Sequence, residues 1–345
     1  MSRMTTAQEV LRSAIPGTPV VAAEISVRGR THEVLLKLES GNPTGSIKDR
    51  TAAGLLMALD AERPLRPGTV VVESTSGNLG LGLARLLHHL DCRFVAVIDP
   101  NTPRATRQTL VAAGGELHEV TEPDGRGGYL LTRLREVRRI LGRNPGYRWT
   151  DQYHNPANPR IHRDTTGPEI AAHGGRDLDA VYIAVSTGGT LAGVAGHLHA
   201  LDRGIAVVAV DAVGSLATGD STGPRLISGI GASRPSAFLT SGSYDRAHRV
   251  PDAEAVAACR LFRADTGVAL GGSSGSVVAA CLRDLASPRP PRRPLCLCAD
   301  SGLAYADTLY DHRWIASHAL SAPVAEAESR LRADGIRFRL KCAYP

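Results

Sequence analysis

The amino-acid sequence predicts an α/β fold in which open, twisted parallel sheets are flanked by helices. Short apolar runs, such as residues 94–98 and 206–210, alternate along the chain with stretches of helical pattern. Several runs end in turns rich in glycine and hydroxyl residues that lead directly into a helix. A chain of 345 residues with 43% hydrophobic content is long enough for two domains with packed cores.

The first strand–helix joint carries Lys48. Residues 34–38 have a strand-like apolar pattern, and the turn at residues 42–47 delivers the lysine to the start of a helix predicted over 49–59. A lysine becomes an imine-forming nucleophile when its ammonium group is partly desolvated and its pKa falls. Taken alone, an ordinary surface lysine explains this position better.

The second joint follows the buried-strand pattern at residues 68–72. Residues 73–80 gather hydroxyls, a glycine and an asparagine before a helix predicted over 79–90. Backbone N–H groups and the helix dipole make such a turn an anion site. A simple capping turn is the alternative.

Two further glycine-rich joints lie in the second half of the chain. Residues 186–190, between the strand at 181–185 and the helix at 191–201, have the composition of a phosphate cradle without Walker or G-x-G-x-x-G spacing. Residues 271–276 precede a helix predicted over 277–285, and a serine there would be a neutral partner for a ring nitrogen. Each turn alone also fits a strand–helix connection without a ligand.

Together, these four segments in this order resemble the fold-type II pyridoxal-phosphate enzymes, the cysteine synthase family. The resemblance runs from about Gly17 to about Asp311. It includes an opening segment at residues 15–21, residues 151–158 with 165–169, and the last active-site loop of the family at residues 299–302. It implies two open twisted sheets flanked by helices and pyridoxal 5'-phosphate as the cofactor.

The resemblance assigns roles residue by residue. Lys48 matches the lysine that holds the cofactor as a Schiff base and acts as the catalytic base. Asn78 matches the partner of the ring hydroxyl, and Ser273 matches the serine that faces the pyridine nitrogen. The loop that grips the substrate α-carboxylate, with help from Gln152, matches Thr75, Ser76 and Gly77. The phosphate cup matches Ser186, Thr187, Gly188, Gly189 and Thr190.

A narrower resemblance appears within the family. Residues 122–133, Ser74, residues 209–215 and residues 229–234 differ from ordinary cysteine synthases. They look like the synthases that open 2,3-diaminopropionate biosynthesis for siderophores such as staphyloferrin B and for peptide antibiotics. That resemblance implies O-phospho-L-serine and L-glutamate as substrates, N-(2-amino-2-carboxyethyl)-L-glutamate as product, and an NAD-dependent dehydrogenase as pathway partner.

A phosphate leaving group requires fixed positive charge, which arginine supplies in bidentate geometry. We expect Arg234, beside the glycine turn at residues 229–231, to be the first candidate and Arg133 the second. A solvated surface arginine is the alternative for each. Tyr153 and Ser186 replace the usual phenylalanine and glycine of cysteine synthases, so they are candidates for substrate selection, with packing as the competing explanation.

Composition argues against several other classes of protein. The net charge is +6, but aromatic content of 4% provides no stacking platform for nucleic acid. No apolar run is long enough to span a membrane, and residues 1–9 lack a signal-peptide core, so we expect a cytoplasmic protein. The six cysteines lack C-x-x-C spacing and the histidines lack H-E-x-x-H spacing, so no metal site is expected.

The domain organisation is predicted to be discontinuous. Residues 45–148 should form the smaller domain with Lys48 and the carboxylate loop. Residues 1–44 and 149–313 should form the larger domain with the phosphate cup. The tail at residues 314–345 departs from the common family length, contains a helical stretch over 324–333, and either packs at a dimer interface or is mobile. Enzymes of this fold type imply a homodimer.

Three functions are weighed. The leading one is the synthase that joins O-phosphoserine and glutamate. The second is a cysteine synthase that uses O-acetylserine or O-phosphoserine with sulfide, and residues 122–133 and 229–234 count against it. The third is a cofactor-free regulatory or scaffold protein, and the presence of Lys48, Asn78 and Ser273 counts against it.

Overall fold

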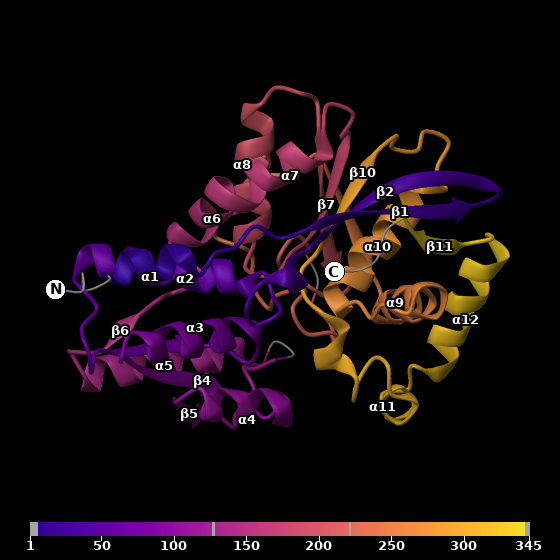
Figure 1. The fold of residues 1–345 in the computed structure, drawn as a ribbon. Helices are drawn as coiled ribbons and strands as arrows, with labels where there is room; N and C mark the ends of the chain where they lie inside the picture. The colour runs from indigo at the N-terminus through magenta and orange to yellow at the C-terminus, as the bar shows by residue number, and fades with distance from the viewer. Residues whose placement is uncertain (1–5, 126–127, 221, 342–345) are drawn as a thin grey trace.

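The computed structural model describes residues 6–125, 128–220 and 222–341, and these residues form two separate sheets (Figure 1). The larger sheet has seven strands, in the order β11 (Arg337–Leu340), β1 (Val20–Val27), β2 (Arg30–Leu38), β10 (Pro294–Cys298), β7 (Ala180–Ala184), β8 (Ala206–Ala212) and β9 (Arg246–Val250). The smaller sheet has four strands, in the order β5 (Gly115–Glu119), β4 (Arg93–Ile98), β3 (Val70–Ser74) and β6 (Arg148–Trp149).

Most neighbouring strands run parallel, as predicted. All pairs in the smaller sheet are parallel, and so are the pairs from β2 to β9 in the larger sheet. The antiparallel part is the hairpin β1–β2 with β11 added at its outer edge. Arg28 and Gly29 both have positive φ, which suits the two-residue turn of a tight hairpin.

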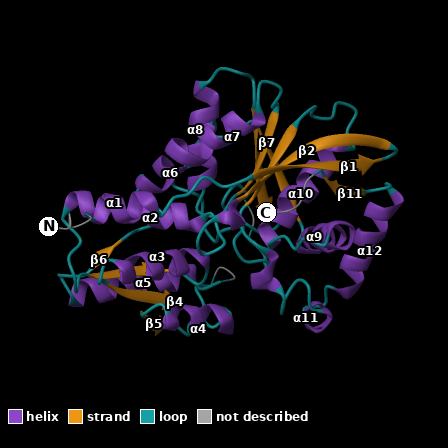
Figure 2. Ribbon diagram, in the orientation of Figure 1, coloured by secondary structure: helices purple, strands orange, loops and turns teal. Residues whose placement is uncertain are grey.

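Helices cover both faces of each sheet (Figure 2). One face of the larger sheet packs on α9 (Asp252–Thr266) and α10 (Gly272–Leu285), and the other packs on α7 (Gly167–Gly174) and α8 (Gly189–Ala200). The smaller sheet lies between α5 (Leu130–Arg143) on one side and, on the other, α2 (Lys48–Glu62), α3 (Asn78–His89) and α4 (Arg104–Ala112). This layering confirms the predicted α/β class.

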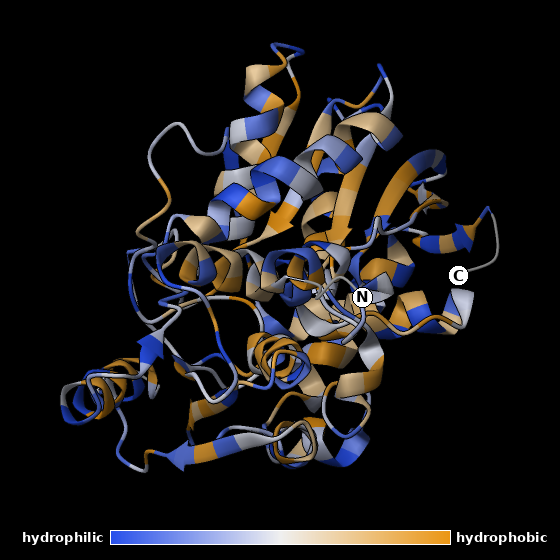
Figure 3. Ribbon diagram, turned by 60° about the vertical axis from the view of Figure 1, so that its left-hand side comes forward, coloured by the Kyte–Doolittle hydropathy of each residue, from blue (hydrophilic) through white to orange (hydrophobic). Residues whose placement is uncertain are grey.

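Side chains that alternate between the two faces of a strand form the hydrophobic cores on both sides of the sheet. In β2, Leu36 and Leu38 face the α9–α10 side and Leu35 faces the α8 side. Side chains of successive strand residues point to opposite faces, so both faces of a sheet covered on two sides are apolar. Orange, hydrophobic residues are prominent in the central strands of Figure 3, whereas the edge strands β5, β9 and β11 carry several polar or charged residues.

Helix α10 begins earlier than the sequence pattern predicts. The predicted start was residue 277, whereas α10 begins at Gly272 and therefore includes Ser273 in its first turn. A Cβ at Gly272 would lie 2.5 Å from Ile227 Cγ2, and a Cβ at Gly275 would lie 2.3 Å from Cys259 Sγ. Close packing therefore requires glycine at these two positions. It also keeps the segment helical, although the low helix propensity of its glycines favours a loop.

The C-terminal segment extends the larger sheet. It contains η3 (Gly302–Tyr305), α11 (His312–Ser317), α12 (Ser321–Ala333) and β11. β11 pairs antiparallel with β1, and the ring of buried Phe338 lies 5.1 Å from that of Phe262 on α9. The tail therefore packs on its own chain, and residues 342–345, including Cys342, lie outside the described residues.

The remaining elements connect these layers: α1 (Ala7–Ser13), η1 (Glu39–Gly41), α6 (Ala157–Ile161) and the π-helix η2 (His162–Thr166). Among the described residues, no helix has the length and apolar character needed to cross a membrane. Cys92, Cys259, Cys281, Cys296 and Cys298 are buried free thiols.

Candidate active site

A small pocket opens where the carboxyl ends of β7 and β10 meet the starts of α2 and α8. Carboxyl ends of parallel strands are the usual ligand-binding edge of such sheets. The lining residues come from four chain segments: Ile47, Lys48, Ala184, Ser186, Thr187, Gly188, Thr190, Gly229, Leu297 and Ala299. The structure therefore brings Lys48 and four of the five predicted cup residues to one pocket, and Gly189 lies between two of them.

Lys48 is the first residue of α2 and is half-buried. Burial lowers the pKa of its ammonium group, although the charges of Asp300 and Glu39 oppose that shift. The segment is held in place because Ile47 N–H donates to Ala299 O at 2.9 Å. The result is an amine with an increased share of the neutral, nucleophilic form.

The lysine content of the chain singles out Lys48. The sequence has three lysines, Lys37, Lys48 and Lys341. Lys37 is paired with Glu169 and Lys341 is paired with Glu33. Lys48 has no ion pair within 4.0 Å in the described part of the chain, so its amine is available at the pocket.

The predicted phosphate cup has no room for side chains at its two glycines. A Cβ at Gly188, where φ is +88°, would lie 2.1 Å from Ser236 Oγ, and a Cβ at Gly189 would lie 2.0 Å from Asn158 Oδ1. The backbone therefore approaches the pocket directly at the N-terminus of α8, where free N–H groups and the helix dipole attract an anion. Together with the hydroxyls of Thr187 and Thr190, this donor set fits the phosphate group of pyridoxal 5'-phosphate.

Asn78 and Ser273 lie in the first turns of two helices, α3 and α10. Asn78 is the first residue of α3, and its Nδ2 donates to Asp300 Oδ2 at 2.8 Å. Ser273 is buried, and a Cβ built on the pocket residue Gly229 would lie 3.9 Å from its Oγ. Ser273 therefore lies close to the pocket residue Gly229, and its role as partner of a ring nitrogen stays a prediction.

The predicted carboxylate loop connects β3 to α3. Thr75 Oγ1 accepts the N–H of Gly80 at 3.0 Å, which closes the loop over the helix start. Gln152, which was also predicted to bind the substrate carboxylate, donates from Nε2 to Ser74 O at 2.8 Å and so contacts the backbone just before this loop. Ser76 and Gly77 are half-buried and stand at the tip of this loop.

Glu73 is a buried carboxylate that the sequence reasoning did not single out. It accepts hydrogen bonds from Thr150 Oγ1 at 2.5 Å, Ser74 N at 2.7 Å and Gln152 N at 3.1 Å. Burial raises the pKa of this carboxyl to about 7, although the hydrogen bonds oppose the shift. An acidic residue inside the apolar strand pattern at residues 70–74 was the available signal.

Arg133, Tyr153 and Arg234 lie together. Arg133 is 8% exposed, and its Nε and Nη1 have no hydrogen-bond partner among the described residues, although Asp99 Oδ2 lies 3.2 Å from Nε. The Arg234 guanidinium carbon lies 5.8 Å from the centre of the Tyr153 ring. Burial raises the pKa of the Tyr153 hydroxyl, and the charges of both arginines oppose that shift.

The two segments that carry the narrower resemblance are neighbours in space. A Cβ at Gly128 would lie 3.3 Å from Ser233 Oγ, so residues 122–133 and 229–234 meet beside Tyr153. Ser186 joins them, because its Oγ donates to Gly231 O at 3.3 Å. Arg126 and Gly127, inside the first segment, lie outside the described residues.

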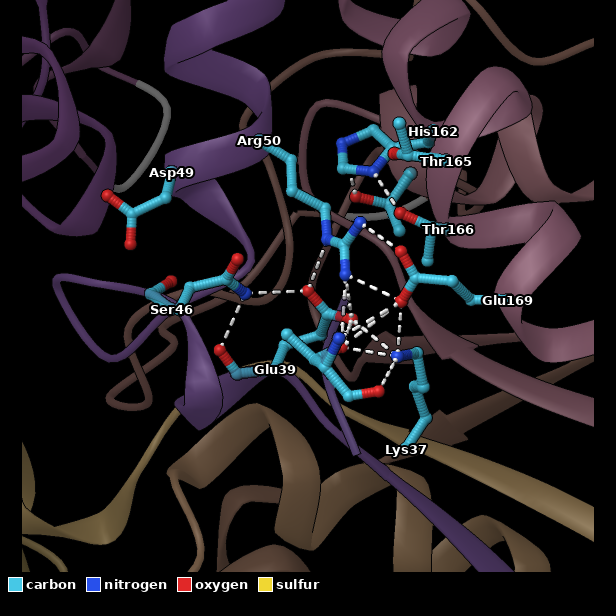
Figure 4. Close-up of polar contacts among 12 residues, drawn as sticks. Lys37, Glu39, Ser46, Asp49, Arg50, His162, Thr165, Thr166 and Glu169 are labelled. Carbon is cyan, nitrogen blue, oxygen red and sulfur yellow. Dashed lines mark hydrogen bonds and ion pairs between the residues drawn. The ribbon is translucent and has the colours of Figure 1, made fainter. Parts of the chain in front are cut away.

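A buried ion network behind Lys48 was also missed. Arg50 Nε donates to Glu39 Oε2 at 2.8 Å, and Arg50 Nη1 donates to Glu169 Oε1 at 2.7 Å (Figure 4). Lys37 Nζ donates to Glu169 Oε2 at 2.6 Å. The network joins β2, η1, α2 and α7, and it fixes the helix whose first residue is Lys48.

His162 connects the same helix to the cup. Its Nε2 lies 3.0 Å from Thr51 Oγ1 on α2 and 3.3 Å from Thr190 Oγ1 on α8. Burial lowers the pKa of the imidazole well below its usual value, so the ring is neutral at physiological pH. No group of acidic, histidine or cysteine side chains in the described residues is arranged to bind a metal ion.

Comparison with known proteins yields one family and several relatives. The family model described as "Pyridoxal-phosphate dependent enzyme" matches residues 11–300. A protein of Ralstonia nicotianae named N-(2-amino-2-carboxyethyl)-L-glutamate synthase is 42% identical over 307 residues, covering 89% of this chain and 91% of the relative. A protein of the same name from Cupriavidus metallidurans is 38% identical over 306 residues, covering 88% and 90%.

Solved structures show a similar fold. The structure of an O-ureido-L-serine synthase matches with a TM-score of 0.77 and 30% identity over 90% of this chain and 96% of that chain. The O-acetylserine-dependent cystathionine β-synthase of Helicobacter pylori matches with a TM-score of 0.77 and 26% identity, covering 89% and 99%.

Proposed function

This chain belongs to the pyridoxal-phosphate-dependent enzyme family, and from that membership we propose that it is a transferase acting on O-phospho-L-serine and L-glutamate. The reaction is a β-replacement whose products are N-(2-amino-2-carboxyethyl)-L-glutamate and phosphate. The observation that carries the proposal is the identity of 42% and 38%, over 89% and 88% of the chain, to two synthases of that name.

The pocket residues would hold the cofactor at both ends. The cup at residues 186–190 would hold the phosphate, and Lys48, Asn78 and Ser273 would contact the ring. When bound, pyridoxal 5'-phosphate supplies an electron sink for the reacting amino acid. Ser273 offers a hydroxyl without charge, so it leaves a ring nitrogen neutral.

Lys48 is the group that transfers the substrate Cα proton during the reaction. Its amine removes the proton from Cα of the substrate and returns it after the new bond has formed. A pKa lowered by burial assists this role, because only the neutral amine accepts a proton. The loop of Thr75, Ser76 and Gly77, supported by Gln152, binds the substrate α-carboxylate with backbone and hydroxyl donors.

The bond changes balance without an oxidant or reductant. The bond between Cβ and the phosphate oxygen breaks, and the oxygen keeps the electron pair. The glutamate nitrogen then forms a bond to Cβ and gives up one proton. Positive charge beside the leaving oxygen stabilises the departing dianion.

We place Arg133 before Arg234 as the group that binds the leaving phosphate. Arg133 is buried and has unpaired N–H groups, whereas Arg234 is half-buried and its Nη2 lies 2.6 Å from His154 Nε2. A desolvated arginine without a full set of partners binds an anion more strongly than an exposed one. Tyr153 and Ser186 complete this side of the site.

A buried cation also argues against the O-acetylserine form of the alternative. The acetyl group of O-acetylserine is neutral and would give the Arg133 N–H groups, whose charge is paired with Asp99 at 3.2 Å, no charged acceptor. Sulfide as acceptor with O-phosphoserine is excluded only by the likeness to the two named synthases.

Phosphate release and product analysis test the function. The enzyme, loaded with pyridoxal 5'-phosphate, is given O-phospho-L-serine with either L-glutamate or sulfide, and the products are identified by mass spectrometry. We expect phosphate release that depends on glutamate and an adduct of the two amino acids. Turnover with sulfide while glutamate is inert would make the protein a cysteine synthase.

Finer features belong to the same proposal. They are a homodimer, a cytoplasmic location, an NAD-dependent dehydrogenase that consumes the product, and the domain division into residues 45–148, residues 1–44 with 149–313, and the tail 314–345. Light scattering after size-exclusion chromatography tests the dimer. A coupled assay with the product and a dehydrogenase that releases 2,3-diaminopropionate tests the partner.

A further inference from the structure

Asp300 is a buried carboxylate that follows Ala299, a residue of the pocket lining. It is 5% exposed, and its Oδ2 accepts two hydrogen bonds, from Asn78 Nδ2 at 2.8 Å and from Tyr305 Oη at 2.7 Å. Its other oxygen, Oδ1, is buried without a hydrogen-bond partner in the described part of the chain. A Cβ at Gly271 would lie 1.8 Å from that oxygen, so the carboxylate is packed directly on glycine backbone.

The backbone around Asp300 joins two further parts of the site. Asp300 forms a β-bridge with Ser46, and Ala299 O accepts the N–H of Ile47, so the loop is paired with the segment that delivers Lys48. Gly271 N–H donates to Asp300 O at 3.3 Å, which ties the loop to the start of α10 beside Ser273. One residue therefore contacts the segments of Lys48, Asn78 and Ser273.

The stability of the fold does not explain why the Asp300 carboxylate is buried. No lysine, arginine or histidine of the described residues forms an ion pair with it within 4.0 Å. Burying a charge without a counter-charge costs free energy, and such groups persist where they serve a site. Lys48 is the cation that acts on it, and that charge lowers the pKa of Asp300 against the larger raising effect of burial.

We propose that Asp300 is a positioning residue: its carboxylate orients the Asn78 amide toward the cofactor, and its backbone pairs with the segment that carries Lys48. An ionised carboxylate only accepts hydrogen bonds, so it requires the NH₂ group of Asn78, and not its oxygen, on its side. The second N–H of that NH₂ group then remains for the cofactor ring. Tyr305 donates to the same oxygen and fixes the carboxylate in this orientation.

This inference rests on the proposed function only through the cofactor, because Asn78 and Lys48 matter here as its partners. It adds a residue to the site and explains the segment at residues 299–302, which resembles an active-site loop without an assigned role. It does not depend on which amine serves as acceptor.

The test is the Asp300→Asn variant, which keeps the size and removes the charge. Loss of a charge-assisted hydrogen bond of this kind corresponds to about a tenfold to hundredfold change in an equilibrium constant. We expect the affinity for pyridoxal 5'-phosphate to fall by that factor and the visible absorbance and fluorescence of the bound cofactor to shift. Tyr305→Phe should change the spectrum in the same direction with a smaller loss of affinity.

Asp284→Asn is the control for loss of a buried carboxylate, although Asp284 also pairs with His248 at 2.9 Å and Arg246 at 3.2 Å. Asp284 is also buried and accepts a tyrosine hydroxyl, from Tyr182 Oη at 2.7 Å. It lies eleven residues after Ser273 on α10, about 16 Å along the helix axis. Its variant should bind the cofactor with unchanged affinity and spectrum.

Each outcome decides the inference. Wild-type affinity and spectrum in Asp300→Asn would overturn it, and so would an equal loss in Asp284→Asn, which would indicate general packing damage. If Asp300→Asn does not fold, an unchanged spectrum in Tyr305→Phe overturns the inference and a shifted one supports it. A wild type that binds the cofactor but does not use glutamate would refute the acceptor and leave the Asp300 result standing.

Discussion

At the scale of single residues, the site depends on charges that are buried without full compensation. Lys48, Arg133 and Asp300 each lack an ordinary complement of partners in the described residues, whereas Lys37 and Lys341 are fully paired. Uncompensated buried charges are rare in proteins because desolvation is costly. Lys48 lines the pocket and Asp300 follows the lining residue Ala299, which points to ligands of opposite charge or covalent chemistry there.

Lys48→Ala should abolish turnover. The amine is the base of the proposed reaction, and alanine can neither accept the proton nor hold the cofactor covalently. We expect the visible absorbance of the bound cofactor to change and phosphate release to fall by at least about a thousandfold. The control is Lys341→Ala, whose lysine pairs with Glu33 at the surface, and near-normal turnover in Lys48→Ala would refute the assignment.

Arg133→Ala and Arg234→Ala should differ in how strongly they impair the kinetics with O-phosphoserine. Arg133→Ala should lower kcat/KM for O-phosphoserine about tenfold to a hundredfold, because a desolvated charge-assisted contact is lost. Arg234→Ala should raise KM for O-phosphoserine more than KM for glutamate, but by a smaller factor, because the half-buried group is partly screened. Steady-state kinetics with each substrate varied in turn measures both effects.

Arg143→Ala is the control for these variants, since Arg143 is exposed at the end of the same helix as Arg133. If Arg133→Ala leaves the kinetics of O-phosphoserine unchanged, its unpaired guanidinium does not bind the phosphate.

Glu73 should make stability depend on pH near neutrality. Its pKa is about 7 in the folded chain and near 4.5 when unfolded, so the folded state holds the extra proton between these values. Glu73 therefore makes its full contribution to the free energy of unfolding below about pH 4.5. As the pH rises to about 7, this free energy falls by ~3 kcal/mol. Urea unfolding of the wild type and Glu73→Gln from pH 5 to 8 measures the difference.

The glutamine variant cannot titrate, so its stability should lack that decline, even if its absolute stability is lower. Glu122→Gln, at an exposed loop position, serves as control and should follow the wild type. Parallel pH profiles for wild type and Glu73→Gln would show that Glu73 is ionised throughout.

At the scale of elements, the start of α2 is held by the network of Lys37, Glu39, Arg50 and Glu169 (Figure 4). Two positive and two negative charges meet there, and three of the four side chains are fully buried. Burial alone would raise the pKa of Glu169, but hydrogen bonds from Arg50 and Lys37 outweigh it and lower the pKa to about 2. The helix that presents Lys48 is thereby joined to the larger sheet.

Removing one member of this network should be costly. Arg50→Ala leaves Glu39 and Glu169 short of counter-charge, so we expect a loss of about 3–5 kcal/mol in the free energy of unfolding. Arg93→Ala, which breaks the surface pair with Glu116, should cost less than about 1 kcal/mol. Denaturant unfolding of both variants makes the comparison, and equal losses would show that the network is not cooperative.

At the scale of the whole molecule, the C-terminal tail completes the larger sheet. β11 covers the outer edge of β1, and Phe338 is 4% exposed against Phe262. Phe338→Ala should therefore cost about 3–5 kcal/mol of stability, as for other buried aromatic residues. The neighbouring exposed residue Arg337 provides the control, with an expected effect within about 0.5 kcal/mol on substitution by alanine.

Thermal and denaturant unfolding measure this effect. A loss below about 1 kcal/mol in Phe338→Ala would mean that the tail contributes little to the core and is not an integral part of the sheet.

The sequence by itself determined the strand–helix joints and the chemistry they carry. Apolar periodicity and the turn residues at 42–50, 73–80 and 186–190 act over a few neighbours, so the positions of Lys48, Asn78 and the cup could be read along the chain. The α/β class follows from the same alternation.

Tertiary structure decided which of these groups face one another. Asn78 meets Asp300 across 222 residues, and α10 starts early because Gly272 and Gly275 pack on Ile227 and Cys259. Arg133 is buried beside Asp99, with two of its nitrogens left without a hydrogen bond in the described residues. None of this has a local signature, because contacts between distant segments are selected by the packing of the whole chain, and the burial that shifts a pKa exists only after the sheets and helices have assembled.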